Sequence, residues 1–287
     1  AAGTYKQGKT RKKSERTIED YQKLVVEDER ETENEYESEY RGKVQNQKSE
    51  LKPMPLYVLT YYKKVSQVNG YTAYASVVDS LNNSHVLPSE LFLSAQERTL
   101  SEQQVERHLS AIDSLADKIG AQPANHVLLF QRAMDYYHVK DFEGAIADMN
   151  AFLQALPADV LGLWLRAQSR MALLQANAKQ AAASDLRLGY LMAQQDFTQC
   201  VSLCPQVAYA HYNLGAVQME LGEVELAVAS YTKAIECDPH FPDAYYNRGV
   251  ANLKLGRKEQ GLSDLSQAGE YGLYHAYSLI KQYSANK

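Results

Sequence analysis

Cysteine is scarce in this chain, with three copies among 287 residues. An odd and sparse set cannot form the disulfide framework that stabilises many small secreted domains. Cys200 and Cys204 lie four residues apart, at helical spacing, but no second cysteine or histidine pair lies close to them in the sequence. This argues against a structural zinc site, so we expect small cysteine side chains packed between helices.

Long apolar runs are also missing. No stretch approaches the roughly 18 apolar residues that a membrane-spanning helix needs. The net charge of −5 lacks the basic excess of a protein that binds phosphate backbones, so we expect no nucleic-acid partner. The sequence begins at Ala1 without a charged and apolar leader, so any targeting signal lies outside it. We expect a soluble protein, either of the cytoplasm or of the periplasm.

Catalytic patterns are lacking too. The sequence has no Gly-x-Ser-x-Gly nucleophile turn, and its isolated glycines do not form a phosphate-binding loop. Its histidines do not pair at a metal-ligand spacing such as His-x-x-x-His. They are His85, His108, His126, His138, His211, His240 and His275. We therefore predict a protein that is not an enzyme and holds neither a metal nor a cofactor.

The first 120 residues differ from the remainder. Residues 1–50 carry many charges of both signs and few aliphatic side chains, which is typical of a solvated helix or a linker. Residues 51–120 are predicted to be a small mixed α/β element. Pro53 and Pro55 exclude a helix at its start, and the β-branched stretch after them favours a strand, either paired or leading into a helix. Asn69-Gly70 marks a turn before a short predicted helix, Tyr71 to Leu81.

One amphipathic helix is strongly indicated over residues 101–119. Ser101 and Gln104 match a capping box, and Leu100 and Val105 are placed as a hydrophobic staple. Apolar residues then recur at helical spacing until Gly120, which is a typical helix end. We expect this helix to pack on the segment that follows it.

Residues 121–287 repeat with a period of 34. Matching residues at this spacing include Gly215 with Gly249, Pro205 with Pro239, Ala133 with Ala167, and Arg132 with Arg166. Pro157 and Pro205 are 48 apart instead, which implies an insertion of 14 residues that we place in Gln175–Ser184. Each unit reads as two antiparallel helices, with small residues at the close crossing and a proline after the second helix.

These residues resemble the tetratricopeptide repeat (TPR) family, most clearly from Ala208 to Pro239, which carries the family's Leu-Gly, Ala, aromatic, Ala and Pro at the expected offsets. The resemblance implies a mainly α fold, an α-α superhelix in which the array spans 121–287. The expected repeats are 126–159, 160–207 with the insertion, 208–241 and 242–271, followed by a capping helix over 273–285. The layout is also similar to that of uncharacterised bacterial TPR proteins with longer chains, which implies that this chain is a C-terminal part.

The resemblance also implies a concave groove that binds a partner helix or peptide. Carrying over the family's offsets, the groove is lined by aromatic, methionine and amide side chains. They are Phe130, Met134, Tyr137, Trp164, Gln168, Met171, Tyr209, Tyr212, Asn213, Met219, Tyr246, Asn247 and Val250, with Ala216 and Leu253 beside them. Some family members hold acidic C-terminal peptides with lysines and arginines. This chain has no cation at those positions, so we expect an aromatic-led groove for another class of peptide.

The predicted function is therefore a non-enzymatic protein–protein interaction module whose partner is another protein or peptide. The alternative is a self-assembly or oligomerisation scaffold in which the N-terminal part docks on the repeats. The tyrosine-rich stretch from Tyr57 to Tyr74 favours that alternative, because tyrosine supplies both apolar area and a hydrogen-bonding group. A homo-oligomer is one form that it would take.

Overall fold

The computed structural model describes residues 51–61, 67–68, 71–72, 91–95 and 100–285. The chain divides into two compact units, 1–49 and 50–287, and every described element belongs to the second. The predicted helix or linker over 1–50 lies outside the described residues.

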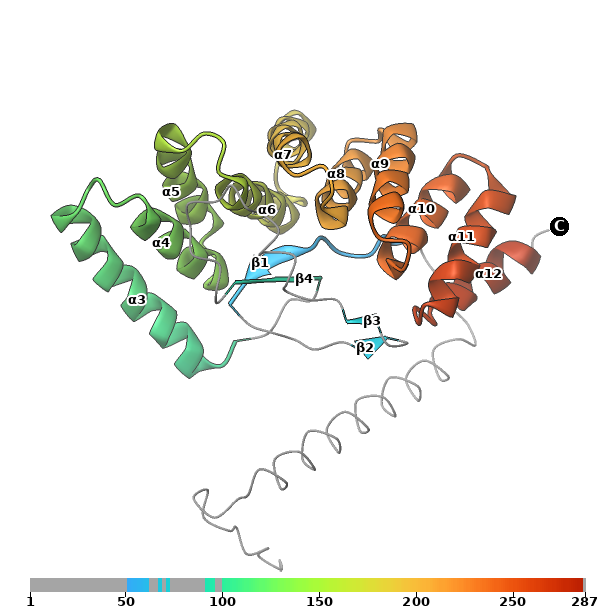
Figure 1. The fold of residues 1–287 in the computed structure, drawn as a ribbon, viewed down its shortest axis with the longest axis horizontal. Coiled ribbons are helices and arrows are strands. Elements are labelled where there is room, and N and C mark those ends of the chain that lie inside the picture. Colours follow the sequence, from blue (N-terminus) through green and yellow to red (C-terminus); the bar gives the residue numbers. More distant parts are fainter. Residues whose placement is uncertain (1–50, 62–66, 69–70, 73–90, 96–99, 286–287) are drawn as a thin grey trace, which may run out of the picture. The chain divides into compact units, whose positions relative to one another are not determined.

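Ten helices follow one another through residues 102–285 of the described part, and Figure 1 shows them arranged along an arc. They are α3 (Glu102–Ala121), α4 (Val127–His138), α5 (Phe142–Ala155), α6 (Val160–Asn177), α7 (Ala183–Leu203), α8 (Ala208–Glu220), α9 (Val224–Cys237), α10 (Pro242–Lys254), α11 (Lys258–Glu270) and α12 (Ala276–Ala285). Short connections make neighbouring helices antiparallel, so α4–α5, α6–α7, α8–α9 and α10–α11 are helix hairpins. The prediction of a mainly α solenoid is confirmed.

The capping box at the start of α3 forms as its sequence indicates. The Ser101 hydroxyl accepts the Gln104 N–H at 3.3 Å, and the Gln104 side chain accepts the Ser101 N–H at 2.9 Å. On the buried face of α3, Ile112 and Leu115 are at most 8% exposed. The helix therefore begins where its caps dictate and packs beside α4 through an apolar stripe.

Small residues set the close crossings inside the hairpins. A Cβ atom on Gly215 in α8 would lie 2.8 Å from the ring of Tyr231 in α9. Gly249 and Gly261 meet in the same way between α10 and α11, where a Cβ on either would lie 3.0 Å from the other's carbonyl oxygen. The period of 34 thus records a packing requirement, since every hairpin needs a small residue at its crossing.

An arginine and an aspartate join the two helices in three of the four hairpins. Arg132 bonds Asp148 at 2.6 and 2.7 Å, and Arg248 bonds Asp264 at 2.7 and 2.9 Å, each across 16 residues of sequence. In the α6–α7 hairpin, Arg166 bonds Asp196 at 2.7 and 3.0 Å across 30 residues. The arginine–aspartate pair thus forms in the same way although the α6–α7 hairpin is longer. The additional residues therefore lie between Arg166 and Asp196.

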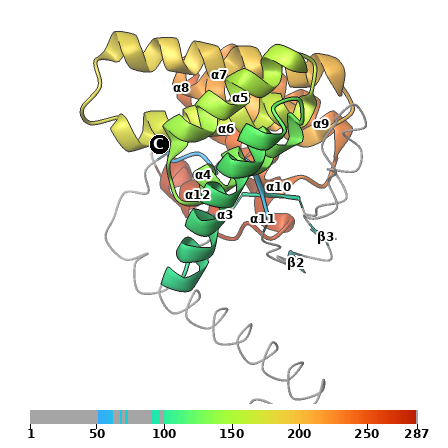
Figure 2. The same cartoon turned by 90° about the vertical axis from the view of Figure 1, so that its left-hand side faces the viewer.

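Those additional residues lengthen both helices of the hairpin. α6 has 18 residues and α7 has 21, compared with 13 each in α10 and α11. The predicted stretch Gln175–Ser184 covers the end of α6, the connection and the start of α7. Figure 2 shows this connection lying outside the other hairpins.

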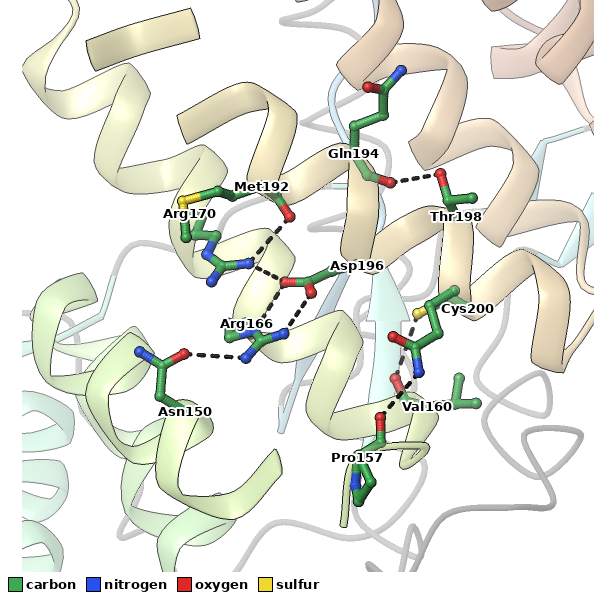
Figure 3. Close-up of polar contacts among 11 residues, drawn as sticks. Asn150, Pro157, Val160, Arg166, Arg170, Met192, Gln194, Asp196, Thr198 and Cys200 are labelled. Atoms are coloured by element: carbon green, nitrogen blue, oxygen red, sulfur yellow. Dashed lines mark hydrogen bonds and ion pairs between the residues drawn. The ribbon is translucent and has the colours of Figure 1, made fainter. Parts of the chain in front are cut away.

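Asp196 is the centre of the polar contacts at the base of this hairpin. Figure 3 shows Arg166 and Arg170 of α6 converging on its carboxyl group, and Arg170 also donates to the Met192 carbonyl at 3.1 Å. Asp196 is 2% exposed, so its charge is balanced by the two guanidinium groups and not by water. Burial lowers the pKa of Arg170, against the opposing effect of Asp196.

The strands form two small antiparallel pairs. β1 (Val58–Thr60) pairs with β4 (Phe92–Ser94), and β2 (Gln67–Val68) pairs with β3 (Tyr71–Thr72). The predicted helix Tyr71 to Leu81 is wrong at its start, because Tyr71 and Thr72 are in a strand. Its remaining residues lie outside the described part. The Asn-Gly sequence between β2 and β3 is a strong hairpin signal, and it outweighs the helical pattern that follows.

Candidate functional site

An extended segment, residues 51–61, lies against helices α6, α8 and α10. Figure 1 shows β1, which is part of this segment, on the inner side of the arc of helices. Pro53 and Pro55 hold the start of the segment in an extended form, because proline fixes φ and restricts the residue before it. We call the helix surface that contacts this segment the inner face. It comprises Trp164, Gln168, Tyr209, Tyr212, Asn213, Asp243 and Asn247, with Phe241 at the start of α10.

Three amide side chains, one from each of three helices, each form hydrogen bonds with the main chain of one residue of the segment. Gln168 of α6 accepts the Leu59 N–H at 2.7 Å and donates to the Leu59 carbonyl at 3.1 Å. Asn213 of α8 accepts the Tyr57 N–H at 2.9 Å and donates to the Tyr57 carbonyl at 2.7 Å. These bonds satisfy buried main-chain groups that would otherwise lose their hydrogen bonds to water.

The third amide, that of Asn247 in α10, bonds both main-chain polar groups of Met54. It accepts the Met54 N–H at 2.7 Å and donates to the Met54 carbonyl at 3.3 Å. Asn213 and Asn247 are 34 residues apart, so the repeat period itself places two of the three amides along the segment. The three contacts use only main-chain atoms of the segment and hence recognise its extended conformation.

Two aromatic donors add to this recognition. Trp164 donates its indole N–H to the Tyr57 carbonyl at 3.0 Å, and Tyr212 donates its hydroxyl to the Pro55 carbonyl at 2.8 Å. Both side chains are fully buried. Burial raises the pKa of Tyr212 well above its ordinary value, so it stays a neutral donor.

The Tyr57 side chain is enclosed by the inner face. Its ring lies 4.5 Å from the ring centre of Tyr209, and 5.4 Å from those of Tyr212 and Phe241. Its hydroxyl donates to the Asp243 carboxyl group at 2.5 Å. Burial raises the pKa of Asp243 to about 6, and the hydrogen bond from Tyr57 partly offsets that rise.

A histidine pair contacts the other end of the segment. His138 of α4 donates Nδ1–H to the Met134 carbonyl at 2.6 Å, and its Nε2 accepts from the Thr60 hydroxyl at 3.3 Å. The His138 ring stacks on His108 at 4.9 Å and on Tyr61 at 5.4 Å. Burial lowers the pKa of His138 to about 4, so this ring is neutral at pH 7.

His108 is paired with a carboxyl group next to this stack. Its Nδ1 lies 2.7 Å from the Asp135 carboxyl oxygen, and both side chains are buried. Burial raises the pKa of Asp135, while its hydrogen bond with His108 lowers it. The spacing of the histidines in the sequence indicated no pairing, but His108 and His138 stack on each other. They lie on different helices, so no spacing in the sequence brings them together.

Six of the residues predicted to line the groove contact the segment. They are Trp164, Gln168, Tyr209, Tyr212, Asn213 and Asn247. Phe130 packs on Phe152, Tyr137 on Phe142, and Tyr246 on His275. Met134, Met171, Met219 and Val250 are buried in the core shared by the helices.

Two residues of the inner face were not predicted as lining residues. Phe241 precedes α10, outside the register used for the first helices. Asp243 lies in the first turn of α10, and its role depends on the hydroxyl of Tyr57, 186 residues away in the sequence. The tyrosine-rich stretch that begins at Tyr57 was the available signal, because a buried tyrosine hydroxyl needs a polar partner.

Among the described residues, no group of three or more histidine, cysteine, aspartate or glutamate side chains is placed to hold a metal ion. No helix there combines the length and the apolarity required to cross a membrane.

Comparison with known proteins agrees with the repeat pattern. Residues 219–256 match the family model for the TPR repeat. No curated protein sequence matches the chain significantly. A crystal structure of MamA superposes with a TM-score of 0.52 at 18% identity, covering 63% of this chain and 99% of MamA.

A second structure, MamA residues 41 to the end from Desulfovibrio magneticus RS-1, has a TM-score of 0.50 at 14% identity. It covers 66% of this chain and 100% of that one. At such identities the likeness shows a common fold and nothing about binding. The match to the tetratricopeptide repeat family therefore covers residues 219–256, which lie within a longer array of helix hairpins.

Proposed function

We propose that this protein is a protein–protein interaction module whose inner face binds an extended polypeptide segment, with its own residues 51–61 as the built-in occupant. The observation that carries the proposal is the row of amides, Gln168, Asn213 and Asn247, each bonded to both main-chain groups of one residue. Main-chain recognition of this kind accepts any segment that is extended and fits the side-chain pockets.

The same geometry favours an extended ligand over a helix. Within a helix the N–H and C=O groups bond to each other four residues apart, so they have no capacity left for side-chain amides. An extended segment leaves both groups of every residue available. Of the two ligand forms that the sequence left open, the extended peptide is therefore the one we propose.

A partner acting in trans has to compete with residues 51–61. A segment tethered in the same chain has an effective concentration of about millimolar, so a free peptide of equal intrinsic affinity binds only when present at comparable concentration. The occupied inner face thus raises the affinity that a partner needs. The 51–61 segment therefore supports the fold and also competes with any partner that binds weakly.

The test uses the full chain with its own segment weakened. Tyr57→Ala combined with Leu59→Ala removes two buried side chains of the segment, and a labelled peptide with the sequence of 51–61 is titrated onto this variant. We expect the peptide to bind the variant at least about tenfold more tightly than the unaltered chain, in which the inner face is occupied.

Two controls accompany that titration. Adding Asn213→Leu to the variant removes the amide that bonds Tyr57 and should abolish binding of the peptide. A peptide of the same composition in scrambled order should not bind. Equal binding to the Asn213→Leu chain, or no binding to any form, would overturn the proposal.

A second candidate function is self-assembly by exchange of the 51–61 segment between copies. It is favoured by the observation that every contact described above joins two parts of one chain, and the same contacts can form between two chains. Light scattering on the full chain distinguishes the two. A dimer that Tyr57→Ala with Leu59→Ala converts to a monomer would indicate exchange, whereas a monomer in both forms would exclude it.

A further inference from the structure

Tyr57 is the anchor of the 51–61 segment. It is 4% exposed, whereas all six residues from Leu51 to Leu56 are half-buried or exposed. Three rings surround it, those of Tyr209, Tyr212 and Phe241, at 4.5 to 5.4 Å between ring centres. Buried aromatic residues of this kind carry much of the binding energy of interfaces.

The end of this pocket is polar. Asp243 lies in the first turn of α10, is 7% exposed, and receives the Tyr57 hydroxyl at 2.5 Å. Tyr57 is the one side-chain donor to this carboxyl group among the described residues. A phenylalanine in place of Tyr57 would fill the aromatic part of the pocket and leave the buried carboxyl group without that donor. Loss of a hydrogen bond costs more free energy at a buried group than at an exposed one, because water cannot replace the donor.

We propose that Tyr209, Tyr212, Phe241 and Asp243 form the specificity pocket of the inner face, and that it selects a partner segment carrying an unmodified tyrosine. Asp243 is the residue that distinguishes tyrosine from phenylalanine. This inference rests on the proposed function, because it names the class of peptide that the inner face takes.

The residue two positions after the tyrosine completes the pattern. Leu59 is 0% exposed and belongs to the same core as the inner face, and Gln168 bonds its main chain. The partner is therefore an extended segment with a tyrosine followed two residues later by a large aliphatic residue. Phosphorylation of the tyrosine would place about two negative charges against a buried carboxyl group, so a phosphotyrosine is excluded.

The experiment is a cycle between peptide and receptor. The receptor is the full chain with Tyr57→Ala and Leu59→Ala, with or without Asp243→Ala. The probes are three labelled peptides with the sequence of 51–61, carrying tyrosine, phenylalanine or phosphotyrosine at the position of Tyr57. Asp243→Asn serves as a second receptor variant of the same shape, and circular dichroism confirms that each receptor is folded.

We expect the tyrosine peptide to bind at least about tenfold more tightly than the phenylalanine peptide when Asp243 is present. With Asp243→Ala that preference should fall to within about threefold, and with Asp243→Asn it should be retained in part because the amide oxygen still accepts the hydroxyl. The phosphotyrosine peptide should bind at least about a hundredfold more weakly than the tyrosine peptide to the receptor with Asp243.

The outcomes separate this inference from the proposed function. Equal binding of the tyrosine and phenylalanine peptides, or a tyrosine preference that survives Asp243→Ala, overturns the pocket while peptide binding stands. Tight binding of the phosphotyrosine peptide overturns it as well. Absence of binding by all three peptides overturns the proposed function, and the pocket with it.

Discussion

Asn213 holds Tyr57 by both of its main-chain polar groups, across 156 residues of sequence. The amide accepts the Tyr57 N–H at 2.9 Å and donates to its carbonyl at 2.7 Å, and Asn213 is fully buried. This contact joins the N-terminal segment to the centre of the array. The folded protein thus depends on the same atoms that we propose for binding a partner.

Loss of that amide should destabilise the protein. Asn213→Ala leaves the buried N–H and C=O of Tyr57 without their partner, at about 1–3 kcal/mol for each unsatisfied group. The measurement is the free energy of unfolding in urea. Asn125→Ala, on the exposed connection before α4, is the matched control and should change it by less than about 0.5 kcal/mol. Similar losses at both positions would contradict the burial of this contact.

Gly215→Ala should overpack the α8–α9 crossing. The new Cβ would lie 2.8 Å from the Tyr231 ring, which is fully buried and cannot move aside freely, so we expect a loss of about 1–3 kcal/mol, and a larger one for Gly215→Leu. Gly120→Ala is the control, because apart from its chain neighbours and the nearby backbone of its own helix no atom lies within 4 Å of its Cβ position. It should leave the melting temperature unchanged or raise it. An unchanged melting temperature for Gly215→Leu would count against the repeat register.

Asp243 should make stability fall as pH rises from about 4 to 6. Burial raises its pKa to about 6 in the folded protein, compared with about 3.9 in an unfolded chain, so the folded state binds more protons in this window. The free energy of unfolding should fall by up to about 1.4 kcal/mol per pH unit, relative to Asp243→Asn, and stay level above the window. The quantity to measure is the difference between the two proteins, and a difference independent of pH would refute the effect.

His138 should make the stability of the protein rise with pH, opposite to Asp243, over nearly the same pH range. Its pKa of about 4 lies below the unfolded value near 6.5, so protonation favours the unfolded state and stability rises with pH between these values. His138→Phe keeps a ring in the stack and removes the titration. We expect the free energy of unfolding of the original protein to gain up to roughly 3 kcal/mol over this variant between pH 4 and 6.5. A constant difference would show that His138 is accessible to water.

Asp196→Asn should be costly because two arginines depend on this carboxyl group. Arg166 and Arg170 would lose their counter-charge in a site where the carboxyl is 2% exposed, and breaking buried pairs typically costs about 3–5 kcal/mol. Glu236→Gln, which breaks the exposed pair with Lys233, is the matched control and should have no measurable effect. Unfolding in urea tests both, and equal effects would mean that the Asp196 cluster is hydrated.

The sequence predicted much of the fold and part of the candidate site. The spacing of Gly215 and Gly249 located the hairpins, because the close crossing recurs in each repeat. The groove offsets implied by the family resemblance placed Asn213 and Asn247 among the lining residues. Phe241 and Asp243 were not predicted. Phe241 lies just before α10, and Asp243 acquires its role only from Tyr57 in a distant segment.

The short helix predicted from Tyr71 shows where local patterns compete. A helical spacing and an Asn-Gly turn signal were both present in the sequence, and the strand pair won at Tyr71 and Thr72. Likewise, no pairing of histidines was predicted, because spacing in the sequence indicates only contacts within a single helix. His108 and His138 meet across α3 and α4, which only the packing of these helices decides.

The sequence by itself determined the array, namely its period and the small residues at the crossings, and the family resemblance implied the inner side that carries the amides. These features are local and repeat because each hairpin solves the same packing problem. Only the tertiary structure decided that residues 51–61 occupy that inner side, with Tyr57 on Asp243. The physical reason is that an extended segment is held there through its main chain, and main-chain hydrogen bonds leave no signature in the order of the side chains.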